Sequence, residues 1–451
     1  MKLFQTLARP FVSFVERYYP DAFIFVIVLS LITFLSALFL TDSTVTSTLL
    51  AWGNGLPMLL KFTAQITIIM VGAHALAHTN PVQKFLTRIG QLPNSANQAY
   101  SLVAFTSGIA SLCAWSFGLV IGAIVARSVA SECAKKSFKI HYPLLVASAY
   151  SGFVIWHMGY SSSAALFVAT PGHLLEDRVG IIPVTETILS STNIVMALMA
   201  LAIITIICPL MRPKDKDIIE FTPNTIDNIE NSALDNQSDL TLIEKFENHR
   251  ALNIFLGFAL VSYIFVTYTQ NGFSLNLNIV SWTFLAFGLI LAASPMHFIK
   301  LINNAAATVG PIILQYPFYS GIMGMMATTG LMKVITDWII SISTPETLGF
   351  FAFLSGGLVN MFIPSGGGQW AVQGPIMIEA ALSLNVNPSV VVLGVAYGDQ
   401  WSNMIQPFWT IPILAIAGLH MRQILGYTFV IFIMTGFLYG GGMLYMGSGN
   451  I

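Results

Sequence analysis

An acidic residue lies inside a long apolar stretch near the C-terminus, in the sequence "AYGDQWSNMIQPFW". Asp399 and Asn403 are four residues apart, so a helix places both on one face, one turn from each other. A carboxylate at the centre of a bilayer costs at least about 2.5–3.5 kcal/mol and usually marks an ion or proton path. We therefore expect Asp399 and Asn403 to hold a proton, a sodium ion or a hydrogen bond to a substrate. The alternative is that Asp399 lies near the outer interface and only caps its helix.

Three consecutive glycines interrupt a second apolar stretch, in "IPSGGGQWAVQGP", and "AWSFG" forms a similar interruption in the first half of the chain. Each glycine costs a helix about 1 kcal/mol relative to alanine, and irregular backbone at membrane depth must be buried in protein or line a wet cavity. A helix that starts after such a turn presents free N–H groups and a positive dipole end to an anion. These turns predict a carboxylate site formed by Ser116, Phe117, Gly118, Ser365, Gly366, Gly367, Gly368, Gln369 and Asn403.

Each turn also has a simpler interpretation, which is a helix kink or a close contact between helices. A third polar interruption, "HMGYSSSAALF", follows the first turn. A lone intramembrane histidine is more often a packed side chain than a proton relay, so this segment is the weaker candidate. Further candidate site residues in these polar segments are His157, Ser161, Ser162, Gln400 and Trp401.

The composition predicts an all-α polytopic membrane protein, because 55% of the residues are apolar and only 9% are charged, against about 25% charged in an ordinary soluble domain. A net charge of −1 gives nucleic acid no basic stripe to bind. The three cysteines show no CxxC spacing, so we expect no disulfide framework, no metal and no cofactor. We expect residues 1–21 to form an amphipathic helix at the bilayer surface rather than a cleavable signal.

Apolar runs of about 20 residues predict membrane-spanning helices, and they lie near 22–41, 52–79, 142–170, 188–211, 251–270, 278–297, 305–332, 389–418 and 424–446. Two further stretches, 103–134 and 350–384, are too long for one crossing and contain a polar break. Short loops rich in Lys and Arg stay in the cytoplasm, and such loops flank 103–134 on both sides. We therefore expect two re-entrant hairpins that point at each other, a cytoplasmic N-terminus and a periplasmic C-terminus.

A short internal repeat supports this arrangement. "FTSG" at Phe105 precedes "AYSG" at Ala149, and "FLSG" at Phe353 precedes "AYGD" at Ala396. Each half thus contains a hairpin followed by two spans, as in the inverted repeats of secondary transporters; the alternative is chance identity in apolar sequence. We expect membrane repeats at 22–211 and 251–451, joined by a polar cytoplasmic linker at 212–250.

Five segments resemble the bacterial short-chain fatty acid transporter family, which is similar in plan to the wider ion transporter superfamily. They are "RYYPDAF", "AWSFGLVIGAIVAR", "HMGYSSSAALFVATPGH", "PSGGGQWAVQGP" and "YGDQWSNMIQPFW". The resemblance implies uptake of monocarboxylates such as butyrate and acetoacetate across the inner membrane, an elevator-like transport domain and a homodimer. The hairpin tips depart from the Ser-Asn-Thr tips of the dicarboxylate carriers, which suits a smaller substrate with an apolar tail.

The sequence also limits the alternatives. Phe117, Trp370 or Trp401 could form an apolar wall for a tail of two to four carbons. Uptake of an anion into a negative interior requires a coupled cation, so we expect symport. A C4-dicarboxylate carrier, an amino-acid carrier and an anion channel stay open as alternatives, whereas an enzyme is not expected, since His157 and Ser161 lie on one helix rather than on facing helices.

Overall fold

The computed structural model describes residues 22–136, 138–221, 241–306, 309–361, 363–406 and 408–449, and these residues form helices and connecting segments without a strand. The helix expected at 1–21 lies outside the described residues, as does most of the polar middle of the expected linker. Among the described residues, six helices are long and apolar enough to cross a membrane, or seven if the bent pair α16 and α17 counts as one span.

The first half of the chain begins with four helices and then folds into a pair of adjacent helices. The bounds are α2 (Ala22–Leu40), α3 (Val45–Gly55), α4 (Leu60–Ala77), α5 (Asn80–Gly90), α6 (Ala96–Cys113) and α7 (Trp115–Lys135). Ser95 caps the start of α6, because its side chain accepts a hydrogen bond from the Gln98 N–H. Helices α6 and α7 pack side by side and are joined by Ala114 alone, whose backbone is extended. This pair corresponds to the hairpin expected near 103–134.

The span expected at 142–170 is broken into pieces. It consists of α8 (Tyr142–Ser151), the 3-10 helix η1 (Gly152–Met158) and α9 (Ser163–Val168). Glycine permits this path: a methyl group on Gly152 would lie 2.5 Å from the Gly108 backbone nitrogen of α6. Runs of 3-10 helix are usually no longer than 3–4 residues, so the seven residues of η1 mark an unusual segment. The half continues through α10 (Glu176–Val179), η2 (Val184–Glu186) and α11 (Ser191–Leu210).

The second half repeats this order of a helix pair, a broken helix and a long helix. Its bounds are α12 (Leu242–Glu247), α13 (Arg250–Asn271), α14 (Leu277–Leu291), α15 (Pro295–Ala306), α16 (Gly310–Thr329), α17 (Leu331–Ile342), α18 (Leu348–Asn360), α19 (Gly366–Ser383), α20 (Pro388–Ser402), α21 (Thr410–Ala417) and α22 (Met421–Gly447). Between the halves lies η3 (Asp215–Asp217). Helices α18 and α19 correspond to the hairpin expected near 350–384, and α20 with α21 to the span expected at 389–418. The inverted orientation of the halves stays a prediction.

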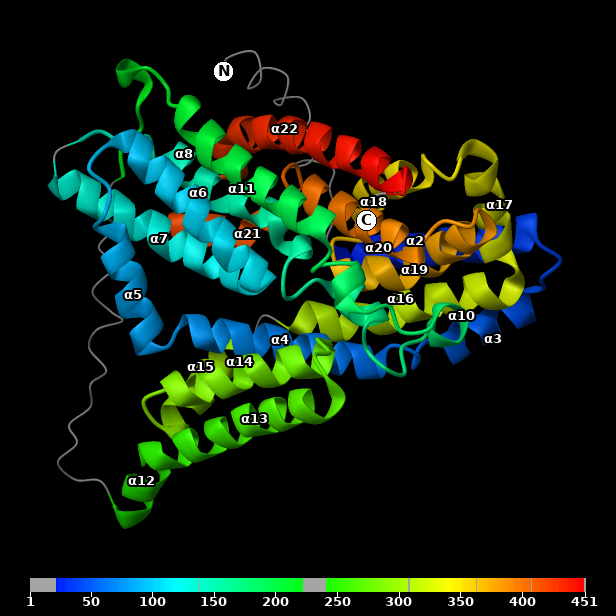
Figure 1. Ribbon diagram of the computed structural model, residues 1–451, viewed down its shortest axis with the longest axis horizontal. Coiled ribbons are helices and arrows are strands. Elements are labelled where there is room, and N and C mark those ends of the chain that lie inside the picture. Colours follow the sequence, from blue (N-terminus) through cyan, green and yellow to red (C-terminus); the bar gives the residue numbers. More distant parts are fainter. Residues whose placement is uncertain are drawn as a thin grey trace.

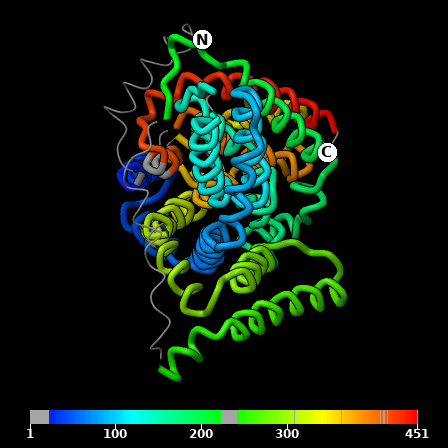
Figure 2. The backbone as a smooth tube through the Cα atoms, turned by 90° about the vertical axis from the view of Figure 1, so that its left-hand side faces the viewer, coloured from blue at the N-terminus to red at the C-terminus, as the bar shows by residue number. Residues whose placement is uncertain are grey.

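The helices form a packed body with a lateral layer. Helices α6, α7, α8, α11 and α22 lie together, and α13, α14 and α15 form a separate layer beneath α4 (Figure 1). Figure 2 shows α13 at the outer edge of this layer. Its candidate spanning segment is only 11% buried within the chain. The polar breaks lie in the packed body, where α20 contacts α9, η1 and α18.

Candidate functional site

The first hairpin tip contacts the first helix break. The backbone N–H of Trp115 donates to the Ser161 hydroxyl at 3.0 Å, and the Tyr160 N–H donates to the Leu112 carbonyl at 2.7 Å. Ser161 therefore satisfies an N–H group at the start of α7, which the helix itself leaves unpaired. Ser161 is thus a structural link between the tip and the break.

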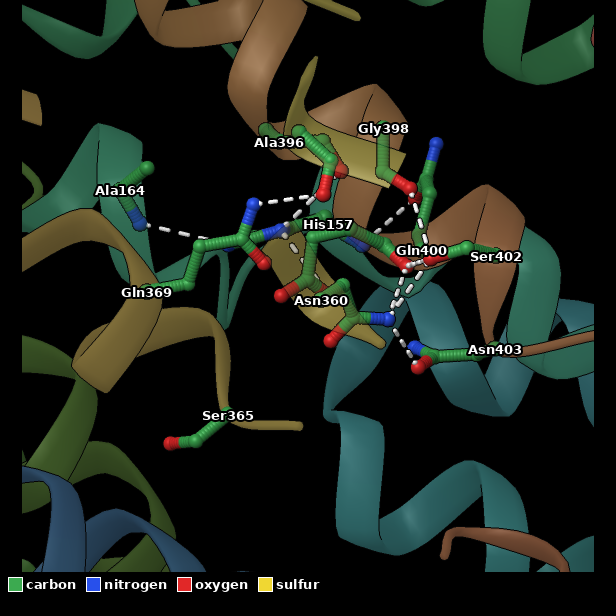
Figure 3. A network of polar contacts seen from close by, with 12 residues as sticks. His157, Ala164, Asn360, Ser365, Gln369, Ala396, Gly398, Gln400, Ser402 and Asn403 are labelled. Carbon is green, nitrogen blue, oxygen red and sulfur yellow. Dashed lines mark hydrogen bonds and ion pairs between the residues drawn. The ribbon is translucent and has the colours of Figure 1, made fainter. Parts of the chain in front are cut away.

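The second tip contacts the second break through Asn360, the last residue of α18. Its amide nitrogen lies 2.9 Å from the Asp399 carbonyl, 2.9 Å from the Ser402 hydroxyl and 2.8 Å from the Asn403 side-chain oxygen, as Figure 3 shows. The Gln406 amide nitrogen donates to the Asn360 carbonyl at 2.7 Å. A polar network thus holds the end of α18 against the end of α20.

Ser365 caps α19, where its hydroxyl accepts a hydrogen bond from the Gly368 N–H at 3.4 Å. The same hydroxyl lies 2.8 Å from the Tyr316 hydroxyl of α16. The glycines after it are required by close packing rather than by unusual torsion angles. A methyl group on Gly366 would lie 2.7 Å from the Trp156 ring, and one on Gly367 would lie 2.7 Å from both the Phe62 ring and the Tyr316 hydroxyl.

His157 is fully buried and links the two broken helices. Its Nδ1 lies 3.2 Å from the Ala396 carbonyl, its Nε2 lies 3.3 Å from the Ala164 N–H, and its own N–H donates to the Gln400 side chain at 2.8 Å. A neutral imidazole with the proton on Nδ1 satisfies both ring contacts, so we assign that tautomer from its partners. The Asp399 carboxylate lies 3.8 Å from Nδ1, beyond a hydrogen bond.

Asp399 is 1% exposed and lies in the last turn of α20. Among the described residues, its second carboxylate oxygen makes no hydrogen bond, and neither do the side-chain oxygens of Asn360 and Gln369. The amide oxygens of Asn360 and Gln369 come from opposite arms of the second hairpin (Figure 3). Leaving a buried polar group without a partner costs about 1–3 kcal/mol. Several buried oxygens with unused acceptor capacity therefore lie around the second hairpin tip.

Two small adjoining cavities lie beside this tip, with volumes of about 50 and 20 Å³. Ile312, Tyr316, Ser365 and Trp409 line both of them. The second is walled by aromatic rings, and its lining includes Trp115, Phe153 and Trp156. The cavities hold a few water molecules at most. Butyrate, which has six non-hydrogen atoms, must therefore displace part of the wall to enter.

The aromatic wall follows from the 3-10 geometry of η1. Side chains three residues apart eclipse in a 3-10 helix, and the Phe153 and Trp156 rings accordingly stack with centroids 5.9 Å apart. Trp409 closes the opposite side, with its ring 4.9 Å from Trp115 and 5.9 Å from Phe153. Sequence reasoning did not identify Trp115, Phe153, Trp156, Tyr316 or Trp409. The only sequence signal is the spacing of three between two of them.

Other expected residues lie away from the cavities. Gly118 packs against Ser111 within the first hairpin, the hydroxyls of Ser116 and Ser162 are buried without a partner among the described residues, and Phe117 is half-buried. Trp401 stacks on Phe432, and its N–H donates to the Phe432 carbonyl at 2.7 Å. Trp370 is fully buried in α19 and lines neither cavity. The residues that face the cavities are those of the second tip, Ser365, Gly366 and Gly367.

An ion pair also links α19, the second arm of the second hairpin, to the first half of the chain. Arg178 of α10 donates to Glu379 of α19 at 2.6 Å, with both side chains partly exposed. Exposed pairs of this kind contribute about 0–1 kcal/mol. The pair therefore orients the outer end of α19 more than it stabilises the fold.

Comparison with known proteins decides the family. A family model described as short chain fatty acid transporter matches residues 3–446. The chain belongs to this family. A protein of Escherichia coli (strain K12) is 37% identical over 96% of this chain and 98% of its own length, and one of Haemophilus influenzae is 37% identical over 98% and 99%. Their names assign them provisionally to short-chain fatty acid transport.

The fold of this family member is also that of a solved transporter. The crystal structure of the Alcanivorax borkumensis YdaH transporter covers 94% of this chain and 98% of its own, with a TM-score of 0.59 and 12% sequence identity. At that identity the likeness concerns the fold alone. Taken together, family and fold make this chain a multi-pass membrane transporter and not an enzyme.

Proposed function

We propose that this family member is a secondary active transporter of short-chain monocarboxylates, such as butyrate and acetoacetate, across the bacterial inner membrane, coupled to a proton or sodium. One observation carries the proposal: the cavity beside Ser365 joins a helix N-terminus to an aromatic wall. A short-chain fatty acid has the matching shape, with one anionic end and one small apolar end.

The tip of α19 suits a single carboxylate. The first N–H groups of a helix are free to donate, and its dipole favours an anion by up to about 2 kcal/mol when partly buried. The Ser365 and Tyr316 hydroxyls bond to each other and leave one further O–H donor at the same place. No Lys or Arg lines either cavity among the described residues. A second carboxylate would therefore lack a charged partner, which favours a monocarboxylate over a C4-dicarboxylate.

Asp399 and Asn403 are the proposed coupling-ion residues. Moving one negative charge into the cell against a membrane potential costs about 2.3 kcal/mol per 100 mV, so accumulation needs a cation. The unpaired carboxylate oxygen of Asp399 would accept a proton, and together with the unpaired amide oxygens of Asn360 and Gln369 it would ligate sodium. Binding there would also stabilise the network that holds the second tip in place.

The proposal includes the expected architecture. The two helix pairs act as opposed re-entrant hairpins of an inverted repeat, and they move with the broken helices as an elevator-like unit within a homodimer. The N-terminus is cytoplasmic and the C-terminus periplasmic. Support comes from the matching order of elements in the two halves and from the contacts of each tip with a helix break.

The test is uptake of radiolabelled butyrate into proteoliposomes under separately imposed proton and sodium gradients, with acetoacetate and succinate as competitors. We expect accumulation above the external concentration under one gradient, blocked by acetoacetate and not by succinate. Flux that only equilibrates under every gradient identifies a channel. Inhibition by succinate indicates a dicarboxylate carrier, and an absence of butyrate flux refutes the substrate class.

A further inference from the structure

The indole N–H of Trp156 is buried and has no hydrogen-bond partner among the described residues. The residue is only 4% exposed, so bulk solvent does not supply the missing acceptor. Tryptophan N–H groups usually find an acceptor when they are buried, and leaving one unpaired is unfavourable. This N–H therefore requires an explanation.

The indole ring is held in a fixed plane. It stacks on the ring of the next residue, His157, with centroids 3.9 Å apart and planes 13° apart. It also stacks on the ring of Phe153, one turn earlier in η1. His157 is itself bonded to Ala396 and Ala164. The ring cannot rotate to find another acceptor without breaking these contacts. An acceptor must instead come to the ring.

The six-membered part of the ring faces the second hairpin tip. A methyl group on Gly366 would lie 2.7 Å from Trp156 Cη2 and 3.1 Å from Cζ2, and Cζ2 is bonded to the ring carbon that carries Nε1. Trp156 and Gly366 line the same cavity as Ser365. The ring that carries the unpaired donor thus lines the cavity beside the N-terminus of α19, which would attract an anion.

We propose that the Trp156 indole N–H donates a hydrogen bond to the carboxylate of the transported acid, and so orients its tail along the ring of Phe153 toward Trp409. The inference rests on the proposed function and adds a carboxylate ligand from the first half of the chain to the donors of the second hairpin. The substrate carboxylate then bridges the two halves, and His157 acts as the positioning residue that holds the indole in place.

The experiment is equilibrium binding of labelled butyrate and acetoacetate to the purified full-length chain, comparing Trp156→Phe with Trp370→Phe. Trp370 is a matched control, because it is also fully buried, its N–H also lacks a partner among the described residues, and it lines neither cavity. Both variants lose the same atoms. We expect the thermal unfolding midpoint without ligand to change similarly in both.

Only Trp156→Phe should weaken binding. Hydrogen bonds to charged groups contribute enough to raise Kd about ten-fold on removal, and the rise should be equal for butyrate and acetoacetate. Replacement of Trp156 by benzothienylalanine, which keeps the ring size and lacks the N–H, should give the same result without a void. If Trp156→Phe fails to fold, the benzothienylalanine variant still tests the hydrogen bond from the indole N–H.

Three results would overturn the inference. Unchanged butyrate binding by either Trp156 variant excludes the bond, and an equal loss in Trp370→Phe reduces the effect to packing. A loss confined to acetoacetate assigns the N–H to the 3-oxo group instead. Wild-type protein that does not bind butyrate at all refutes the proposed function as well, so the two failures are distinguishable.

Discussion

The Tyr150 hydroxyl donates a hydrogen bond of 2.8 Å to the backbone carbonyl of Asn403. A tyrosine from the first broken helix thus contacts the break of the second. Its counterpart in the short repeat, Tyr397, donates to the Asn193 side chain at 2.7 Å, and Asn193 donates to the Met158 carbonyl at the first break at 3.0 Å. Each break is therefore held by a tyrosine from the opposite half, once directly and once through an asparagine.

Tyr150→Phe tests whether this bond supports ion binding. A typical hydrogen bond contributes about 1 kcal/mol net, so we expect the cation concentration for half-maximal uptake to rise about five-fold. The KM for butyrate at saturating cation should change little. The control is Tyr100→Phe, which removes a buried hydroxyl that accepts from the His141 N–H at 2.8 Å. A fall in maximal rate without a shift in cation dependence would contradict this role.

Asp399→Asn tests the coupling site directly. Because the amide carries no charge and takes up no proton, we expect gradient-driven accumulation of butyrate to fall to the equilibrium level. Counterflow exchange of butyrate should persist, since Asp399 does not line the cavities. Asp337→Asn is the control, because Asp337 forms an exposed pair with Lys333. Intact accumulation in Asp399→Asn would refute the assignment.

Ser365→Ala removes both the α19 cap and the contact with Tyr316. Loss of a cap typically costs about 1 kcal/mol of stability, and loss of a hydroxyl donor to a carboxylate should raise the KM for butyrate roughly ten-fold. Ser365→Thr keeps the hydroxyl and should retain most of the affinity. If alanine and threonine behave alike in uptake kinetics, the hydroxyl does not contact the substrate.

Gly367→Ala tests the close approach of the second tip. The added methyl group would lie 2.7 Å from the Phe62 ring and from the Tyr316 hydroxyl, so the tip cannot seat against α4 and α16 as observed. We expect transport to fall at least ten-fold, together with a lower unfolding midpoint. Gly441→Ala in α22 is the matched control, since nothing lies within 4 Å of its added methyl group. Wild-type transport in Gly367→Ala would show that the tip does not close there.

Trp409→Ala tests the end of the proposed tail pocket. The ring lines both adjoining cavities, so its removal should enlarge the space available to a tail. Hexanoate has two CH₂ groups more than butyrate, and each further buried CH₂ contributes about 0.8 kcal/mol. We therefore expect inhibition of butyrate uptake by hexanoate to strengthen about fifteen-fold relative to inhibition by acetate. Phe408→Ala, which alters a neighbouring ring of the first cavity only, is the comparison. An unchanged chain-length profile would place the tail elsewhere.

The sequence was sufficient to predict the helix pairs and the broken helices, because glycine and polar residues inside apolar runs are costly and therefore conspicuous. It also predicted the buried carboxylate of Asp399. It did not predict the aromatic wall, because aromatic residues are common in membrane helices and read equally well as packing or interface anchors. Trp401 and Trp156 look alike in sequence. Only the 3-10 geometry of η1 and the positions of α16 and α21 decide which of them faces a cavity.

The residues Ser116 and Gly118 illustrate a related limit. Their positions after a predicted turn suggested a ligand site equivalent to the second tip. In the structure the first tip is a single residue, and Gly118 packs closely against Ser111 of α6. The ligand role of Ser116 and Gly118 stays a prediction. Whether a residue near a tip contacts a ligand or a neighbouring helix depends on long-range packing, which local sequence patterns do not encode.

The two hairpin tips differ in length. Ala114 alone joins α6 to α7, whereas α18 ends at Asn360 and α19 begins only at Gly366. A tip of one residue can move only if both of its helices move as a rigid piece, but a longer connection can change shape while its helices stay in place. The carrier should therefore be kinetically asymmetric. Release of the substrate past the second tip would be limited by local loop motion on the nanosecond-to-microsecond scale. Release of the substrate past the first tip would be limited by the slower displacement of an entire helix pair.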